Sequence, residues 1–107
     1  MYTVRIMNEY LHGPIWVYGP NGIVQRHFAL IDNDPILHEL DTRGEELYSS
    51  YYDFDEDEQS CTFAEDRYRA DKAEMLDIIT KIKKRLDEIN DGSFVVEDYE
   101  TEGLLHL

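Results

Sequence analysis

A single apolar stripe in the second half of the chain constrains the fold more than any other feature of the sequence. Its members are spaced by three, four or seven residues, as the buried face of an α-helix requires; they are Tyr68, Met75, Ile79, Ile82, Leu86 and Ile89. Thr62 and Glu65 have the spacing of a capping box, and Gly92 suits the end of a helix. The pattern therefore predicts one long helix over residues 63–91, whose apolar face other elements must cover.

The first thirty residues carry strand signals instead. Residues 2–10 alternate in polarity with a period close to two, and residues 15–18 form a short run of aromatic and β-branched side chains. Between this run and residues 23–30 lies the sequence Gly-Pro-Asn-Gly, in which Asn-Gly supplies the positive φ angles of a hairpin turn. A meander of three strands is therefore expected.

A second helix is predicted after this meander. Asp34 can cap it, and Pro35 suits its first position, where a missing N–H costs nothing. Helical spacing then continues to about residue 52, through Ile36, Leu37, Leu40, Leu47, Tyr48 and Tyr51. Gly44 weakens the middle of this helix by about 1 kcal/mol, which leaves a kink or two shorter helices as alternatives.

Together these elements predict a single α+β domain over residues 1–107. A last strand is expected at residues 93–99, followed by a frayed tail at residues 100–107. The expected architecture is a small antiparallel sheet, formed by three N-terminal strands and one C-terminal strand. It packs with two helices, in the order βββααβ.

The net charge of −14 is concentrated in one part of the chain. Residues 32–60 hold eleven acidic side chains and one basic side chain, Arg43, so this segment alone carries a charge of −10. Such a field repels nucleic acids and anionic membrane surfaces, and it attracts basic proteins or cations. With one cysteine, no signal-peptide pattern and no apolar run long enough for a membrane helix, we expect a soluble, cytoplasmic protein.

The acidity is densest at residues 51–58, where five carboxylates occur among three aromatic rings. Like charges at this density repel one another, so the run is not expected to serve stability. Asp53, Asp55 and Asp57 have the spacing of a calcium-binding EF-hand loop, but Glu58 and Ala64 stand where that loop needs glycine and glutamate. We therefore expect no metal or other cofactor. A solvated acidic loop and a surface that binds a basic partner remain as interpretations.

The partner-binding interpretation assigns contact to rings and carboxylates together, because tyrosine supplies a large contact area while carboxylates steer a basic partner. The candidate contact residues are Tyr48, Tyr51, Tyr52, Asp53, Asp55, Glu56, Asp57 and Glu58. Among the rings, we expect Tyr48 to face the core and Tyr52 to be exposed.

No catalytic site is predicted. The four histidines, His12, His27, His38 and His106, show no metal-ligand spacing. Cys61 has acidic neighbours, which do not activate a thiol, and Ser49 and Ser50 have no base near them in the sequence. A binding protein is therefore expected, not an enzyme.

Two segments carry a family resemblance: residues 8–18, NEYLHGPIWVY, and residues 88–98, EINDGSFVVED. With its small size and acidity, the chain resembles the small immunity proteins of bacterial contact-dependent growth inhibition and other polymorphic toxin systems. The resemblance implies an inhibitor that binds one cognate toxin, usually a basic nuclease, inside the producing cell. It transfers no catalytic residues, because that family has none.

Three other classes of protein remain open. A nucleic-acid mimic that blocks a DNA-binding protein would spread carboxylates over one long face, whereas the predicted helix at residues 63–91 is nearly neutral. A small enzyme would need a deep pocket with converging polar groups. The third class is a small acidic domain of unknown role, in which the charge serves no binding.

Overall fold

A computed structural model describes residues 1–55 and 60–107 of the chain. Its strands are β1 (Tyr2–Ile6), β2 (Ile15–Tyr18), β3 (Val24–Gln25), β4 (Tyr52–Phe54), β5 (Cys61–Phe63) and β6 (Phe94–Asp98). Its helices are α1 (Ala29–Asp32), α2 (Pro35–Ser49), α3 (Glu65–Ala70), α4 (Lys72–Ile89) and α5 (Thr101–Leu105).

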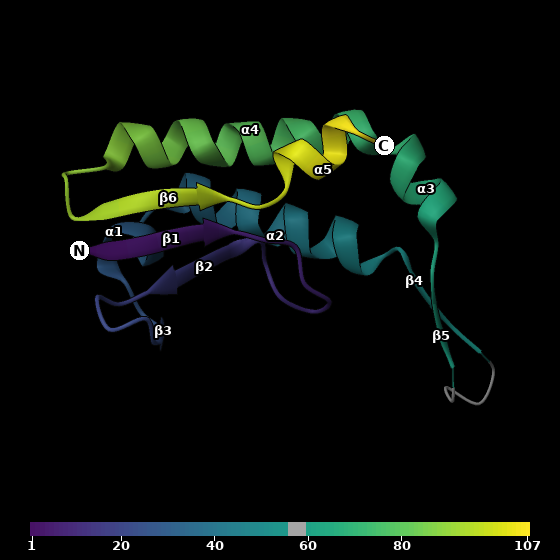
Figure 1. Cartoon of the computed structure of the whole chain (residues 1–107), viewed down its shortest axis with the longest axis horizontal. Coiled ribbons are helices and arrows are strands. Elements are labelled where there is room, and N and C mark those ends of the chain that lie inside the picture. The colour runs from purple at the N-terminus through teal and green to yellow at the C-terminus, as the bar shows by residue number, and fades with distance from the viewer. Residues whose placement is uncertain (56–59) are drawn as a thin grey trace.

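Four strands form a sheet in the order β3-β2-β1-β6, α2 and α4 pack together, and β4 and β5 form a separate hairpin (Figure 1). The predicted α+β class, with two main helices and a C-terminal strand in the sheet, is confirmed. The sheet is mixed, however, because β6 runs parallel to β1, from Tyr2 opposite Phe94 to Ile6 opposite Asp98. The physical reason is that α4 carries the chain back to the end of the sheet at which β1 begins (Figure 1).

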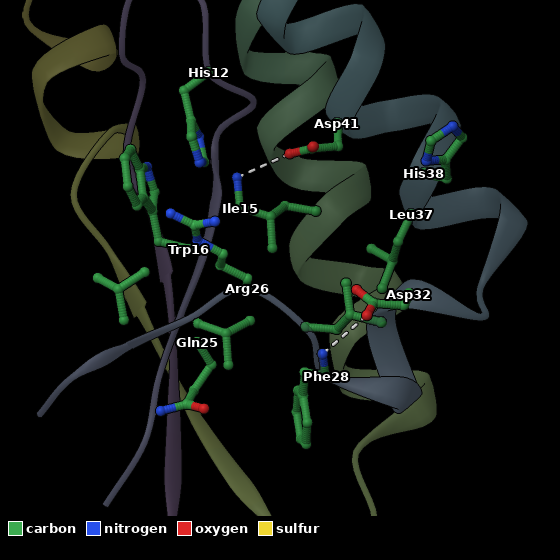
Figure 2. Close-up of a pocket in the computed structure, with 13 residues that line it drawn as sticks. His12, Ile15, Trp16, Gln25, Arg26, Phe28, Asp32, Leu37, His38 and Asp41 are labelled. Carbon is green, nitrogen blue, oxygen red and sulfur yellow. Dashed lines mark hydrogen bonds between the residues drawn. The ribbon is translucent and has the colours of Figure 1, made fainter. Parts of the chain in front are cut away.

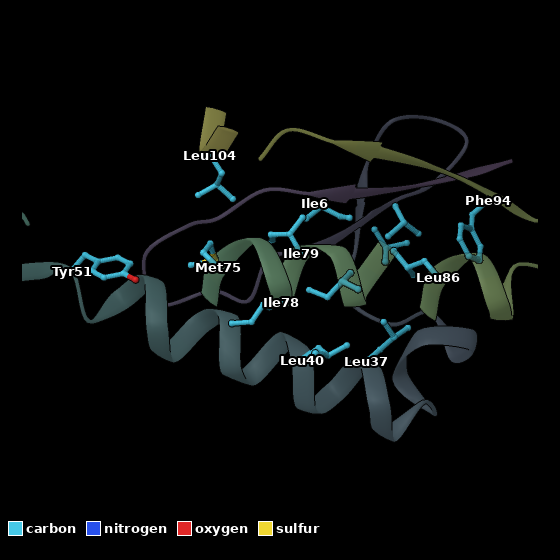
Figure 3. Packing of buried hydrophobic residues seen from close by; sticks show 13 residues of the cluster. Ile6, Leu37, Leu40, Tyr51, Met75, Ile78, Ile79, Leu86, Phe94 and Leu104 are labelled. Carbon is cyan, nitrogen blue, oxygen red and sulfur yellow. The ribbon is translucent and has the colours of Figure 1, made fainter. Parts of the chain in front are cut away.

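The core lies between the sheet and the helices α2 and α4 (Figure 3). Its buried apolar side chains are Val4, Ile6, Val17, Leu37, Leu40, Tyr51, Met75, Ile78, Ile79, Ile82, Leu86, Phe94 and Leu104. The stripe predicted for the long helix is confirmed, since its four central members have no exposed surface and Tyr68 and Ile89 are half-buried. Burial of this stripe is what joins the helices to the sheet.

Helix α2 begins as predicted and continues through Gly44 without a break. The carboxylate of Asp34 accepts a hydrogen bond from the Leu37 N–H at 3.0 Å, and it also forms an ion pair with Arg85 of α4 at 2.6 Å. Gly44 is buried against Pro14, so glycine serves here for a close approach between the helix and the loop that precedes β2. The helix ends at Ser49, three residues earlier than expected.

The prediction of one long helix from residue 63 is wrong at its start. The helix is divided at Asp71 into α3 and α4, and Thr62 lies in β5 instead of capping a helix. Ala64 is the N-cap of α3 and makes no side-chain cap bond. Pairing of β5 with β4 explains the difference, because it holds Thr62 opposite Asp53 in extended conformation.

The third predicted strand is also shorter than expected. Strand β3 covers only Val24–Gln25, and the short helix α1 occupies residues 29–32. Phe28 explains the change of direction: its ring stacks on Tyr2 at 4.8 Å between centroids and meets Phe94 edge-on at 6.1 Å. The chain must leave the sheet edge for this ring to reach the core.

The expectation of a frayed C-terminal tail is wrong. Helix α5 covers Thr101–Leu105 and places Leu104 in the core with no exposed surface. Asp98 holds the start of this helix, because its carboxylate accepts hydrogen bonds from the N–H groups of Glu100 and Thr101 at 2.8 and 3.0 Å. Lys83 of α4 adds an ion pair with the same carboxylate at 3.0 Å.

Replacement of Gly44 by alanine should destabilise the protein. The added Cβ would lie 2.8 Å from Cγ and 2.9 Å from Cδ of Pro14, so the helix or the loop must shift, at a cost of about 1–3 kcal/mol. Gly103→Ala in α5 is the matched control, because no atom lies within 4 Å of its added Cβ. Urea unfolding of both variants measures the difference, and equal midpoints would contradict the assigned role of Gly44.

Asp98 should make the free energy of unfolding depend on pH in acid. Burial alone would raise the pKa of Asp98, but hydrogen bonds from Thr101, Glu100 and Lys83 outweigh it and hold the pKa at about 2. A folded-state pKa below the unfolded value of 3.8 stabilises the protein above that value, and this stabilisation is lost as the pH falls towards 2.

The stability difference between the parental protein and Asp98→Asn should therefore shrink between pH 5 and about 2. Denaturant unfolding across this range measures it. The difference for Asp87→Asn, an exposed position on α4, should stay constant. A parallel decline for both variants would show that Asp98 is not the responsible group.

Candidate functional site

The acidic run predicted as a connector is partly built as a hairpin. Strand β4 pairs antiparallel with β5, with Tyr52 opposite Phe63 and Phe54 opposite Cys61. The hairpin extends away from the rest of the protein beyond the end of α2 (Figure 1). The radius of gyration, 14.8 Å, accordingly exceeds the roughly 13 Å of a compact domain of this length.

An aromatic cluster supports the base of this hairpin. Its members are Tyr10, Tyr48, Tyr51, Tyr52, Phe54, Phe63 and Tyr68, with neighbouring ring centroids between 4.7 and 6.4 Å apart. Most pairs meet edge-on or tilted, which is the favourable arrangement for aromatic quadrupoles. The cluster joins α2, both hairpin strands and α3, so it fixes the direction in which the hairpin leaves the domain.

The three candidate tyrosines have different positions in this cluster. Tyr51 is 1% exposed, and its hydroxyl donates a hydrogen bond to Asp71 at 2.9 Å. Tyr48 and Tyr52 are both half-buried, and their hydroxyl oxygens lie 3.3 Å apart. Burial raises the pKa of Tyr48 and of Tyr51, and it raises the pKa of Tyr68 to about 12. All three hydroxyls therefore stay protonated near neutral pH. Because Tyr51 is buried, it supports the cluster from inside and is not part of the exposed surface.

Two of the acidic candidates, Asp53 and Asp55, are exposed on the hairpin. Asp53 has 61% of its side chain exposed and forms an ion pair with Arg67 of α3 at 2.6 Å. Asp55 is exposed and accepts a hydrogen bond from the hydroxyl of Ser60 at 3.0 Å. The other three predicted contact residues, Glu56, Asp57 and Glu58, lie outside the described residues.

Two further apolar side chains belong to this surface but were not among the predicted contacts. Phe54 is 48% exposed and packs on Tyr10, whose ring also contacts Tyr52. Phe54 lies within the acidic run and could have been chosen from the sequence, since it alternates with the acids. No sequence signal places Tyr10 there, because it is more than forty residues away in the chain.

A tight turn holds Tyr10 in this position. Leu11 has a φ angle of 59°, in the left-handed region that costs a residue with a side chain about 1 kcal/mol. Its N–H donates to the hydroxyl of Ser49 on α2 at 3.0 Å, while its side chain is 66% exposed. The turn thus presents an apolar side chain to solvent beside the hairpin.

A half-buried carboxylate anchors the start of the same loop. Glu100 accepts hydrogen bonds from the backbone N–H of Asn8 at 3.1 Å and from its side-chain amide at 3.0 Å. Burial raises the pKa of Glu100, and these two bonds act in the opposite direction. The loop is therefore tied to both α2 and the C-terminal segment.

The described part of the chain holds neither a cluster of metal-binding side chains nor a helix that could cross a membrane. No group of three or more His, Cys, Asp or Glu side chains there could hold a metal ion. None of the helices there has the length and apolar composition that crossing a membrane requires. Cys61 is a free, exposed cysteine on β5.

Comparisons of the chain with models of known protein families, with curated proteins and with solved structures found no match. The geometry alone defines the candidate site: it consists of the acidic hairpin, its aromatic cluster and the adjoining turn at Tyr10 and Leu11.

Truncation of Tyr51 should loosen the hairpin. Tyr51→Phe removes the bond to Asp71 and should cost about 1 kcal/mol, whereas Tyr51→Ala leaves a cavity and should cost about 3–5 kcal/mol. Hydrogen exchange should accelerate at the N–H of Ala64, which donates to the carbonyl of Tyr51 at 2.6 Å. Tyr52→Phe is the control, because it removes only a half-exposed hydroxyl contact. Equal losses for Tyr51→Ala and Tyr52→Phe would contradict this assignment.

Proposed function

We propose that this protein binds and neutralises a basic toxin, as immunity proteins do, through the acidic hairpin. The observation that carries the proposal is the projection of the hairpin, which presents Asp53, Asp55 and the half-exposed Phe54 together at one end of the domain. A nuclease binds polyanions through lysine and arginine, so a surface that presents carboxylates has the sign of charge that such a site recognises.

Charge and apolar area have separate tasks in this proposal. Carboxylates raise the rate of encounter with a basic partner, by a factor of about 10 to 1,000 at low salt. Exposed rings and aliphatic side chains slow dissociation once the complex has formed, because they are desolvated at the centre of the contact. The exposed side chains of Phe54 and Leu11 supply this apolar part.

The alternative of a nucleic-acid mimic receives less support. A mimic needs unpaired carboxylates along an extended face, whereas three cations of α4 form ion pairs with acids. Lys81 pairs with Asp77 at 2.9 Å, Lys83 with Asp98 at 3.0 Å, and Arg85 with Asp34 at 2.6 Å.

The direct test is neutralisation of the protein encoded by the adjacent gene. Expression of that protein alone should arrest growth, and co-expression with this chain should restore it. The two purified proteins should form a complex of one copy each, measured by light scattering. If co-expression gives no protection and the purified proteins do not associate, the proposal fails.

Removal of charge from the hairpin segment should slow association without impairing the fold. Asp55, Glu56, Asp57 and Glu58 are changed to the corresponding amides, and the control variant carries the same change at Glu74, Asp77, Asp87 and Glu102 on α4 and α5. Both variants lose four negative charges, so only the position differs.

Stopped-flow measurements should give an association rate about tenfold lower for the hairpin variant at low salt, with little change for the control. The difference should disappear as salt screens the charges. Equal rates for the two variants would show that only the net charge matters, and would count against the hairpin as the contact.

A further inference from the structure

A pocket of about 320 Å³ lies between β2, the segment after β3 and the first half of α2 (Figure 2). It is distinct from the hairpin. Apolar side chains line its interior: Ile15, Val17, Phe28, Ile31 and Leu37. Its polar lining includes His12, Arg26, His38 and Asp41. The volume is at the lower end of the range for ligand pockets, roughly 300–1,000 Å³, and suits one side chain better than a cofactor.

The pocket exists because β3 is short. Only Val17 and Tyr18 of β2 have partners in β3, so Ile15 and Trp16 have no neighbouring strand on that side. Helix α2 covers this gap with a carboxylate: the N–H of Ile15 donates to Oδ1 of Asp41 at 3.0 Å. The carboxylate lies over Gly13, where any Cβ would collide with it.

Asp41 presents a half-buried carboxylate to this pocket. Burial raises its pKa, while the bond from Ile15 acts in the opposite direction. Oδ2 has no hydrogen bond or ion pair with any described residue. A half-buried carboxylate with a free oxygen gains free energy when a cation with N–H donors reaches it.

Two fixed rings form the wall opposite α2. His12 and Trp16 stack at 3.6 Å between centroids, with 7° between their planes. The indole N–H of Trp16 donates to the carbonyl of Met7 at 2.9 Å, and Nδ1 of His12 faces the carbonyl of Gly13. Because a carbonyl only accepts, Nδ1 carries the proton. A planar cation can stack on such rings without the cost of ordering them.

We propose that this pocket receives one arginine side chain of the basic partner, with its guanidinium group between Asp41 and the stacked rings of His12 and Trp16. This inference rests on the proposed function. The apolar interior accommodates the methylene groups of the arginine, and the planar guanidinium matches both the carboxylate and the rings. The field of a chain with net charge −14 favours a cation over an anion.

The pocket and the hairpin are connected by one loop. The loop that carries Tyr10 to the hairpin carries His12 to the pocket, two residues later. Helix α2, which runs between the two sites, is about 22 Å long, and an interface of standard size is roughly 30 Å across. One partner can therefore cover both sites.

Arg26 gives the proposal its sharpest test. It is exposed, lines the pocket and forms no ion pair with a described residue. Its charge opposes an incoming guanidinium, so its removal should strengthen arginine binding. If the pocket instead held a carboxylate through Arg26 and the histidines, the same change would weaken binding.

The experiment is an NMR titration of the whole protein with N-acetyl-arginine amide, using N-acetyl-citrulline amide as the uncharged isostere and acetate as the anion. The reporters are the backbone N–H of Ile15 and the indole N–H of Trp16. We expect saturable shifts with the arginine compound alone. Affinity should fall at least tenfold in Asp41→Asn, rise in Arg26→Gln, and stay unchanged in the control Asp87→Asn, at an exposed position of α4 that does not line the pocket.

The proposal is overturned if citrulline amide binds as well as the arginine compound, if acetate binds and Arg26→Gln weakens it, or if none of the three shifts the reporters. The side-chain oxygen of Asn can still accept the bond from Ile15, so Asp41→Asn should fold. If it does not fold, the change in affinity for the arginine compound in Arg26→Gln tests the proposal: a rise supports it and a fall contradicts it.

The toxin assays separate this inference from the proposed function. With the partner, Asp41→Asn should raise the dissociation rate and leave association unchanged, the reverse of the hairpin variant. Neutralisation of the toxin without any binding of the arginine compound would refute the pocket alone. Specific arginine binding without a toxin complex would refute the proposed function and with it the assigned partner.

Discussion

Burial of one face of the sheet beneath α2 and α4 is the constraint on which the rest of the structure depends. The buried side chains of the two helices form one apolar cluster with Val4, Ile6 and Phe94 of the sheet, and removal of this surface from water stabilises the fold. The positions of other elements follow from this packing. Helix α5 packs into the core through Leu104, and the loop before β2 packs against Gly44 of α2 through Pro14. Function is consequently confined to what this packing leaves outside.

The hairpin lies outside this packing. Its arrangement explains how the fold accommodates the repulsion within the acidic run of the sequence. Crowded carboxylates destabilise a fold. In this sequence, however, they come directly after rings of the aromatic cluster that holds the base of the hairpin in place. The pair of Asp53 and Arg67 also removes part of the repulsion at that base. Asp53 and Asp55 thus lie at a distance from the core, where repulsion between them costs least and where the proposed basic partner would meet them.

The loop between β1 and β2 connects the hairpin with the pocket. Its residues contact α2 at three points, through Leu11 with Ser49, Gly13 with Asp41, and Pro14 with Gly44. The left-handed conformation of Leu11 is maintained by these contacts, since the turn is tied down on both sides. These contacts hold residues of both proposed sites in place, which would lower the entropy lost on binding of the proposed partner.

The sequence by itself determined the elements that depend on local periodicity: the stripe of α4, the cap of α2 at Asp34, the first two strands and the α+β class. It also determined where the charge is concentrated. It misplaced what depends on contacts between distant segments. Thr62 has the spacing of a helix cap, but it lies in a strand because it pairs with Asp53. The tail is helical because Leu104 reaches the core. Only the tertiary structure decided that Tyr10 stands beside Tyr52 and that Asp41 faces His12 across a pocket, because neither proximity is encoded in the spacing of residues along the chain.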